Sequence, residues 1–239
     1  FYYCDGFTEV YSSAEVAPKL ETNAFANINE NATLYYPASS EPSYDEKGWF
    51  NYFSNNIGFN GKCGDNLFWN VDDTNTLTIF GTGKMYDYDY SGDNISPWRK
   101  LETAPTTLVL EEGITHIGTV AFYDCYGFTG SLTIPNSVTT IEESAFDGCS
   151  GFTGFLTIGN SVTNIGYYAF YGCSGFTGSL TIPNSITNIS NYAFSGCSGF
   201  TGSLTIPNSV TFIGEYAFYD CSGFTGSLTI PNSVTTIGN

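Results

Sequence analysis

Three aspartates within seven residues are the strongest candidates for metal chemistry in this chain. They are Asp87, Asp89 and Asp93. With Gly92 at the turn, they match the opening of a calcium-binding loop, in which oxygen ligands alternate and glycine permits a sharp bend. The match ends at Trp98, which stands where such a loop needs a bidentate glutamate. We therefore favour a solvated acidic turn over a calcium site and expect no cofactor.

Five cysteines recur every 24 residues, and evenly spaced cysteines suggest either a disulfide framework or a metal site. If the repeated segments stack, however, equivalent side chains point the same way, which is poor geometry for a disulfide. No Cys-x-x-Cys or Cys/His cluster supports zinc. We expect a ladder of buried thiols that pack as small hydrophobic groups. Its members are Cys125, Cys149, Cys173, Cys197 and Cys221. Cys4 holds the same position in a partial copy, and no role is assigned to Cys63.

Other residues with catalytic potential are isolated in the sequence. The single histidine, His116, occupies a position that other copies fill with Thr, Asn or Phe, so we expect a surface residue. Residues 81–84 (Gly-Thr-Gly-Lys) lack the spacing of a phosphate-binding loop and are expected to form a turn. Glycosylation sequons begin at Asn31, Asn94 and Asn188. The chain is predicted not to be an enzyme.

These residues must be positioned by a repeat that fills the second half of the chain. Five copies of 24 residues start at positions 107, 131, 155, 179 and 203, and a sixth begins at 227 and stops at 239. A fixed period of this length is typical of a solenoid, in which each copy buries its apolar face against its neighbours. Residues 1–8 match 122–129, so the chain begins and ends within a copy, and we expect a segment of a longer protein. The copies are numbered coils 1 to 6 below.

Each copy predicts a short strand, a turn and a compact return. Residues 132–134 (Leu-Thr-Ile) alternate apolar and polar, as a half-buried strand does. Pro135 and an Asn-Ser pair end the strand. The Ala145-Phe146 pair and Cys149 have the spacing of one turn of helix or 3-10 helix. Strands of successive coils are expected to pair in parallel in one sheet, above a core ladder of phenylalanines at Phe122, Phe146, Phe170, Phe194 and Phe218.

The pattern L-T-I-P-N-S-V-T-x-I-x-x-x-A-F-x-x-C-S-G-F resembles the BspA-type leucine-rich repeats. Departures are small, such as Gly159 in place of the proline that ends the strand. The resemblance implies a repeat solenoid of the leucine-rich-repeat type. Its parallel β-sheet lies on one face, its short helical or 3-10 turns and loops lie on the other, and a small β-rich insert precedes the array. The resemblance also implies a cell-surface or secreted location and an adhesive role.

Three regions are predicted along the chain. Residues 1–59 resemble the end of a preceding repeat block with its closing segment. Residues 60–104 contain two strands around the turn at 72–75 and are expected to form a capping or connecting element that covers the first edge of the array. Residues 105–239 form the array itself.

The charge of the chain excludes whole classes of partner. The net charge is −17, and all six Lys and Arg residues precede the repeats. Such a surface repels phosphate backbones, so we expect no nucleic-acid partner. No run of eighteen apolar residues exists, so we expect no membrane insertion in this segment.

Variation between the copies is concentrated around the Ala-Phe pair and is rich in tyrosine. The predicted interaction surface consists of Tyr167, Tyr168, Tyr171, Tyr192, Tyr216 and Tyr219. Plain solvated tyrosines are the simpler interpretation. The partner is expected to be a protein or glycan on another cell, or the chain itself. The leading hypothesis is an adhesive surface protein or a structural fibre; the alternatives are a filament subunit that self-assembles end to end and an ice-binding solenoid with regular Ser and Thr files.

Overall fold

The computed structural model describes residue 1 and residues 4–29 and 31–239, and the chain divides into two compact units. The units are Phe1–Lys62 with Phe68–Asn70, and Cys63–Leu67 with Val71–Asn239. Tyr2 and Tyr3, which belong to the predicted partial copy at the start of the chain, lie outside the described residues, as does Glu30. The predicted region boundaries near residues 60 and 104 stay a prediction.

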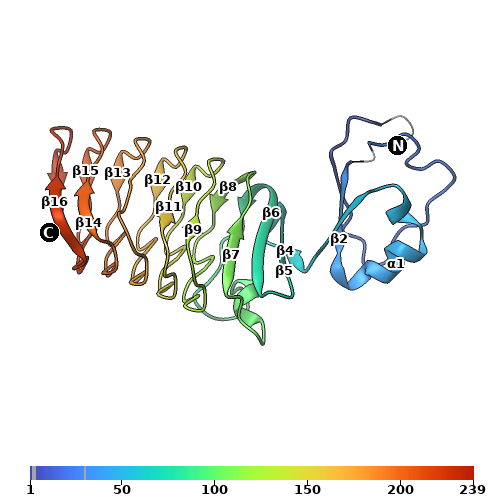
Figure 1. Ribbon diagram of the computed structural model, residues 1–239, viewed down its shortest axis with the longest axis horizontal. Coiled ribbons are helices and arrows are strands. Elements are labelled where there is room, and N and C mark those ends of the chain that lie inside the picture. The colour runs from blue at the N-terminus through green and yellow to red at the C-terminus, as the bar shows by residue number, and fades with distance from the viewer. Residues whose placement is uncertain (2–3, 30) are drawn as a thin grey trace. The chain divides into compact units, whose positions relative to one another are not determined.

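The first unit contains a three-stranded parallel sheet and short helices (Figure 1). Its elements are β1 (Glu9–Tyr11), β2 (Thr33–Pro37), η1 (Ala38–Ser40), α1 (Glu41–Glu46), η2 (Trp49–Asn51), β3 (Asn55–Phe59) and β4 (Gly61–Lys62). Leu34 and Tyr36 of the central strand β2 are buried in a cluster with Phe25. Trp49 packs against Phe25 at 5.1 Å between ring centroids and donates its Nε1–H to the Pro18 carbonyl at 2.9 Å. The segment after β2 therefore covers the aromatic core of this unit.

The β-rich insert consists of β5 (Gly64–Val71) and β6 (Thr76–Met85), which are neighbours in one sheet. Asp72 fixes the turn between them, because its carboxylate accepts hydrogen bonds from the Thr74 hydroxyl at 2.7 Å and from the Thr74 and Thr76 amides at 2.9 and 3.0 Å. These hydrogen bonds, that of the Thr74 hydroxyl above all, hold the pKa of Asp72 below its ordinary value. The turn expected at residues 72–75 is therefore present.

The repeats stack as coils in the second unit (Figure 1), and β6 starts both of the strand ladders that join them. Ladder A follows the Asn-Ser turn of each coil: β8 (Ile114–Ile117), β10 (Thr140–Ile141), β12 (Asn164–Ile165), β13 (Asn188–Ile189), β15 (Phe212–Ile213) and β17 (Thr236–Ile237). Ladder B is formed by the predicted Leu-Thr-Ile strands: β7 (Thr107–Leu110), β9 (Leu132–Thr133), β11 (Leu156–Thr157), β14 (Gly202–Thr205) and β16 (Phe224–Thr229). Both ladders are parallel, and equivalent residues pair, as Thr140 does with Asn164.

Ladder A runs through all six coils, whereas ladder B is interrupted. Strands β9 and β11 form one pair, β14 and β16 another, and Thr181 pairs with Thr205 alone. In coils 2 and 5 the serine at the start of the strand accepts an amide hydrogen bond from the next coil, as Ser131 Oγ does from Phe155 at 3.0 Å. Phe155 lacks such an oxygen, and its ring lies so close to Gly178 that no Cβ would fit there. The strands of each coil thus form two ladders instead of the one expected, and ladder B is interrupted between coils 1 and 2 and between coils 3 and 4.

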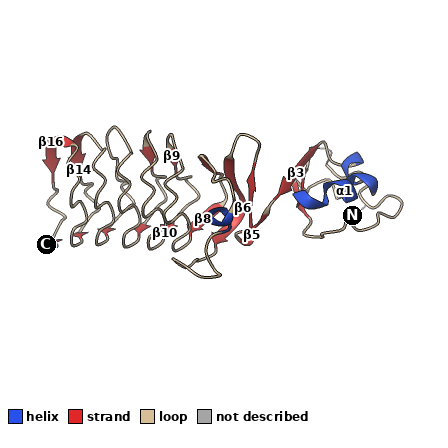
Figure 2. Cartoon of the chain, turned by 90° about the horizontal axis from the view of Figure 1, so that it is seen from below, coloured by secondary structure: helices blue, strands red, loops and turns tan. Residues whose placement is uncertain are grey.

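The Ala-Phe segment of each coil forms successive turns rather than a continuous helix. Its hydrogen bonds are of the 3-10 type, such as Cys149 N–H to the Phe146 carbonyl at 3.1 Å. The residue before the alanine is left-handed in coils 1 to 5, with φ of 50° at Ser144 and 56° at Tyr168, which interrupts helical continuation. The Phe146 amide instead donates to the Ala169 carbonyl of the next coil at 2.8 Å. Figure 2 shows that most of each coil is loop and turn.

The core of the coils is an aromatic stack. The rings of Phe122, Phe146, Phe170, Phe194 and Phe218 follow one another at 5.1, 5.3, 5.4 and 5.6 Å, with ring planes within 9° of parallel. The first four are fully buried. A second file of phenylalanines, from Phe128 to Phe224, stacks beside it at 5.1 to 6.0 Å. Burying such a side chain contributes about 1.5–3 kcal/mol, so the ladder holds the coils together without ion pairs.

Candidate functional site

The predicted calcium loop is part of a segment that is bound to coil 1. We call residues 86–100 the strap; it ends in η3 (Pro97–Lys100). The Asp87 carboxylate accepts the Thr119 amide hydrogen at 2.8 Å, and the Asp89 amide donates to the Asn94 carbonyl at 2.9 Å. Among the residues that the structure describes, no three metal-ligating side chains gather in one place. The aspartates of the strap therefore serve its attachment and its internal turn.

The strap takes the place of a coil in front of coil 1. Between coils, the Val120 and Phe122 amides donate to the carbonyls of Glu143 and Ala145 at 2.9 and 2.7 Å. On coil 1, the matching carbonyls of Thr119 and Ala121 accept from the Tyr88 amide and the Trp98 indole N–H, both at 2.9 Å. The Trp98 ring stacks on Phe122 at 5.0 Å and 19°. The strap thus continues both the hydrogen bonding and the aromatic stack.

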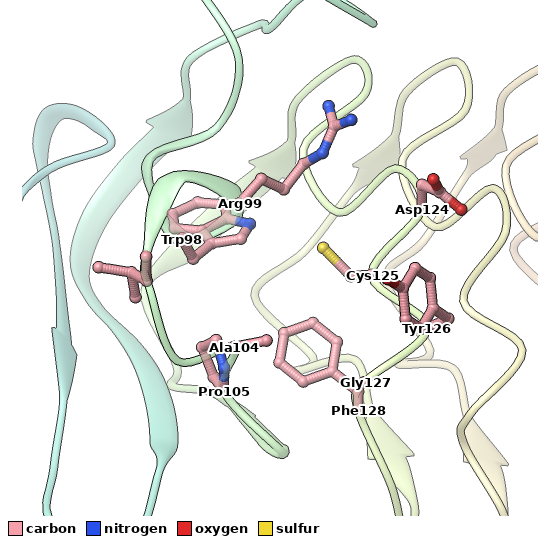
Figure 3. A pocket seen from close by; sticks show the side chains of 10 residues that line it. Trp98, Arg99, Ala104, Pro105, Asp124, Cys125, Tyr126, Gly127 and Phe128 are labelled. Atoms are coloured by element: carbon pink, nitrogen blue, oxygen red, sulfur yellow. The ribbon is translucent and has the colours of Figure 1, made fainter.

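A cavity of about 250 Å³ lies between the end of the strap and coil 1. Trp98, Pro105 and Phe128 line it, and Figure 3 shows the Cys125 sulfur directed into it. In later coils the equivalent thiol donates to a phenylalanine carbonyl of the coil before. Cys125 lies against the strap instead, and burial raises its pKa to about 12. A thiol with a raised pKa is a weak nucleophile.

The other ladder thiols are packing groups. Cys149, Cys173 and Cys197 are buried, and each donates to the carbonyl of a phenylalanine 27 residues earlier at 2.9 to 3.1 Å. Cys221, half-buried in coil 5, makes the same contact at 3.0 Å. Burial raises the pKa of all four thiols, and the six cysteines from Cys63 onward are unbridged. Burial likewise raises the pKa of Cys63.

The remaining candidates lie apart on the surface. His116 is half-buried in β8 beside Lys84 of β6, and its Nδ1 is 3.0 Å from the Thr115 hydroxyl. Burial, with Lys84 second, lowers the pKa of His116. Lys84 belongs to a strand, so residues 81–84 form neither the expected turn nor a phosphate loop. The sequon residues Asn31, Asn94 and Asn188 are exposed.

The six predicted interface tyrosines lie on the turn face of coils 3 to 5. Tyr168, Tyr192 and Tyr216 stack on one another at 4.7 and 5.0 Å, with planes within 21° of parallel. Each has a left-handed φ between 53° and 58°. Tyr171 and Tyr219 meet this stack edge-on at 5.6 and 5.7 Å. Tyr167, Tyr171, Tyr216 and Tyr219 are 53, 42, 42 and 62% exposed. The structure therefore brings the six together in one surface, which we call the tyrosine face.

The surroundings of the tyrosine face are acidic. Coils 1 to 6 contain eight Asp and Glu residues and no Lys or Arg. Burial, followed by the neighbouring Tyr168 and Tyr216, raises the pKa of Tyr192. Burial also raises the pKa of Asp147 to about 6. The tyrosine face therefore lies on an array that carries carboxyl groups and no Lys or Arg.

Comparison with known proteins identifies the repeat. Residues 115–239 match the model of the BspA type leucine rich repeat region in 6 copies. The chain belongs to the BspA-type leucine-rich repeat family. Comparison with curated proteins gives no match. The family and the solenoid fold expected from the sequence are thus confirmed, and the repeat family indicates a role in protein interaction.

Solved structures of bacterial leucine-rich repeat proteins resemble this BspA-type chain. One from Eubacterium ventriosum is 32% identical, with a TM-score of 0.54 over 65% of this chain and 39% of that one. One from T. pallidum is 23% identical, with a TM-score of 0.46 over 75% and 82%. A leucine-rich cell surface protein from Faecalibacterium prausnitzii is 21% identical, with a TM-score of 0.48 over 71% and 54%. This chain spans less than half of the E. ventriosum protein.

The sequence of this BspA-type chain did not lead us to predict that strap residues cover the turn face of coil 1. The Arg99 guanidinium lies 5.1 Å from the centre of the Tyr123 ring, and Tyr90 meets the same ring edge-on at 4.8 Å. A signal was present, because Tyr123 holds the repeat position of Tyr171 and Tyr219. Among the helices that the structure describes, none has the length and apolar character needed to span a membrane.

Proposed function

We propose that this chain is a non-catalytic binding module of a bacterial cell-surface or secreted protein, and that the tyrosine face is its contact surface. The observation that carries the proposal is the ordered, exposed row of tyrosines on a rigid stack of coils. Tyrosine offers a large contact area and a hydroxyl group at a low cost in side-chain entropy. The near-identity of the coils supports repeated weak contacts that add up to useful avidity.

A pull-down tests the proposal. The immobilised chain is incubated with surface extracts of candidate partner cells, and retained proteins and glycans are identified. The double variant Tyr167→Ala and Tyr216→Ala is expected to lose a specific partner. Tyr126→Ser removes a tyrosine that is 68% exposed at a position where the next four coils carry serine, so it is the matched control. Equal retention by all three proteins would contradict the proposal.

A structural fibre element is the second candidate, supported by the regular stacking of the phenylalanine ladder at 5.1 to 5.6 Å. A fibre element should form filaments that are visible by electron microscopy and persist in the tyrosine double variant. End-to-end self-assembly of the isolated chain is tested in the same images. The break in ladder B weighs against ice binding, because it interrupts the Thr157–Thr181 file; thermal hysteresis would test that role.

A further inference from the structure

The strap shows what kind of side chain the turn face accepts. At coil 1, Arg99 lies over the face of Tyr123 and Tyr90 packs against it edge-on. The Tyr90 hydroxyl donates to Ser144 Oγ at 2.9 Å, and the Arg99 guanidinium donates to the Tyr90 carbonyl at 3.4 Å. A guanidinium over an aromatic ring is attracted by the negative charge of the ring face. Coil 1 therefore carries a complete arginine-on-tyrosine contact supplied by the chain itself.

Coils 3 and 5 repeat this arrangement with the arginine missing. Tyr171 and Tyr219 hold the repeat position of Tyr123. Tyr168 and Tyr216, from the same coils, provide the edge-on contact that Tyr90 provides at coil 1, with ring planes at 69° and 82° against 89°. The two rings remain 42 and 62% exposed. In coils 2 and 4 the same position carries Asp147 and Ser195, so the exposed rings alternate along the stack.

The charge of the array favours a cationic side chain over a neutral or acidic one on these two rings. The array contains no Lys or Arg, and the exposed Glu215 and Asp220 lie next in sequence to Tyr216 and Tyr219. Such a surface attracts cationic partners and steers their approach. Arginine suits the site better than lysine, because its planar guanidinium stacks on aromatic rings and is less strongly hydrated.

We propose that the tyrosine face binds an arginine-bearing segment of a partner protein, with one guanidinium on Tyr171 and another on Tyr219, as Arg99 lies on Tyr123. This inference rests on the proposed interaction role and names the partner's chemistry. The two rings are two coils apart, roughly 10 Å at about 4.8 Å per coil. A polyproline II segment rises about 3.1 Å per residue with three residues per turn, so two arginines three residues apart lie on one face at about the spacing of the two rings.

Fluorescence anisotropy with the whole chain tests this inference. The probe is a fluorescein-labelled Gly/Ser peptide that carries two arginines separated by two residues; its lysine and citrulline versions are the comparison probes. The arginine peptide should bind most tightly, the lysine peptide more weakly and the neutral citrulline peptide least. Tyr171→Ala and Tyr219→Ala should each weaken binding about 2- to 5-fold, and Tyr→Phe at either site should change it less than about 2-fold.

Two controls separate this site from general attraction to an acidic protein. Phe155→Ser removes an aromatic side chain that is 62% exposed and restores the residue of most other coils, so it should leave binding unchanged. Arg99→Ala uncovers the Tyr123 ring and should strengthen binding; circular dichroism checks that the strap and coils remain folded. Equal binding of the arginine and citrulline peptides would overturn the inference. So would arginine-peptide binding that weakens with added salt but is unchanged by the tyrosine substitutions.

The outcome is distinguishable from failure of the proposed function. A partner captured through the tyrosine face that does not compete with the arginine peptide refutes this inference and leaves the binding role intact. Binding of a neutral oligosaccharide to the same tyrosines, without binding of the peptide, also refutes it. If the peptide binds as described but no partner is captured, the arginine site stands and the adhesive role fails.

Discussion

The phenylalanine ladder and the tyrosine face are two aromatic stacks built on the same coils, one inside and one outside. Their ring spacings are similar, 5.1 to 5.6 Å inside and 4.7 to 5.0 Å outside. Their surroundings differ, because Phe146, Phe170 and Phe194 are fully buried while Tyr216 is 42% exposed. Coil spacing therefore sets the geometry of both stacks, and burial decides which of them stabilises the fold.

The largest expected effect is on the inner stack. Phe170→Ala removes a ring that is stacked on both sides, and the cavity cannot close because the neighbouring coils hold its walls apart. The free energy of unfolding should fall by about 3–5 kcal/mol. Urea denaturation followed by circular dichroism measures the change. A loss below about 1 kcal/mol would mean that the inner ladder does not hold the coils together.

The next effect concerns the end of that stack at the strap. Trp98→Phe keeps a ring above Phe122 but removes the buried hydrogen bond to the Ala121 carbonyl. Leaving that carbonyl unpaired should cost about 1–3 kcal/mol. The same urea titration measures it, with Tyr126→Ser as the control. No loss would show that the strap is not needed as a substitute coil.

A smaller effect depends on pH. Burial raises the pKa of Asp147 from its ordinary 3.8 to about 6. Between these values the folded chain binds more protons at this carboxyl than the unfolded chain does. Stability should therefore fall as the pH rises from about 4 to about 6, and level off above. Asp147→Asn should flatten this slope in melting curves recorded across the range, and an unchanged slope would contradict the assignment.

The smallest effect is expected on the outer stack. Tyr192→Ala removes a ring between Tyr168 and Tyr216 at the surface, where exposed aromatic contacts contribute about 0.5–1.5 kcal/mol at most. Tyr192→Phe should leave the free energy of unfolding unchanged within error. If the alanine variant loses as much stability as Phe170→Ala, the two stacks do not differ in the way that burial implies.

The structural features that recur in every coil were predictable from the sequence, whereas the strap, which occurs once, was not. The 24-residue period and the Leu, Ile, Ala and Phe positions predicted the stacked coils and their buried core, because each apolar position recurs in every copy. The period also predicted that the tyrosines lie on one surface. It did not predict that Ile141 and its equivalents form the continuous ladder, since Leu132-Thr133 has the clearer strand pattern. Nor did it predict the strap, because Tyr88, Trp98 and Arg99 imitate a coil in space without sharing its sequence.

The break in ladder B also has a consequence for cooperativity. A stack of coils unfolds as one unit only where the coupling between neighbours exceeds the instability of a single coil. At the Phe155 side chain, coils 3 and 4 are not joined by ladder B, as coils 1 and 2 are not, while ladder A and the phenylalanine stack continue. The coupling between coils 3 and 4 is thus weaker than that between coils 2 and 3, and amide hydrogens near Thr181 should exchange with solvent earlier than their counterparts near Thr133.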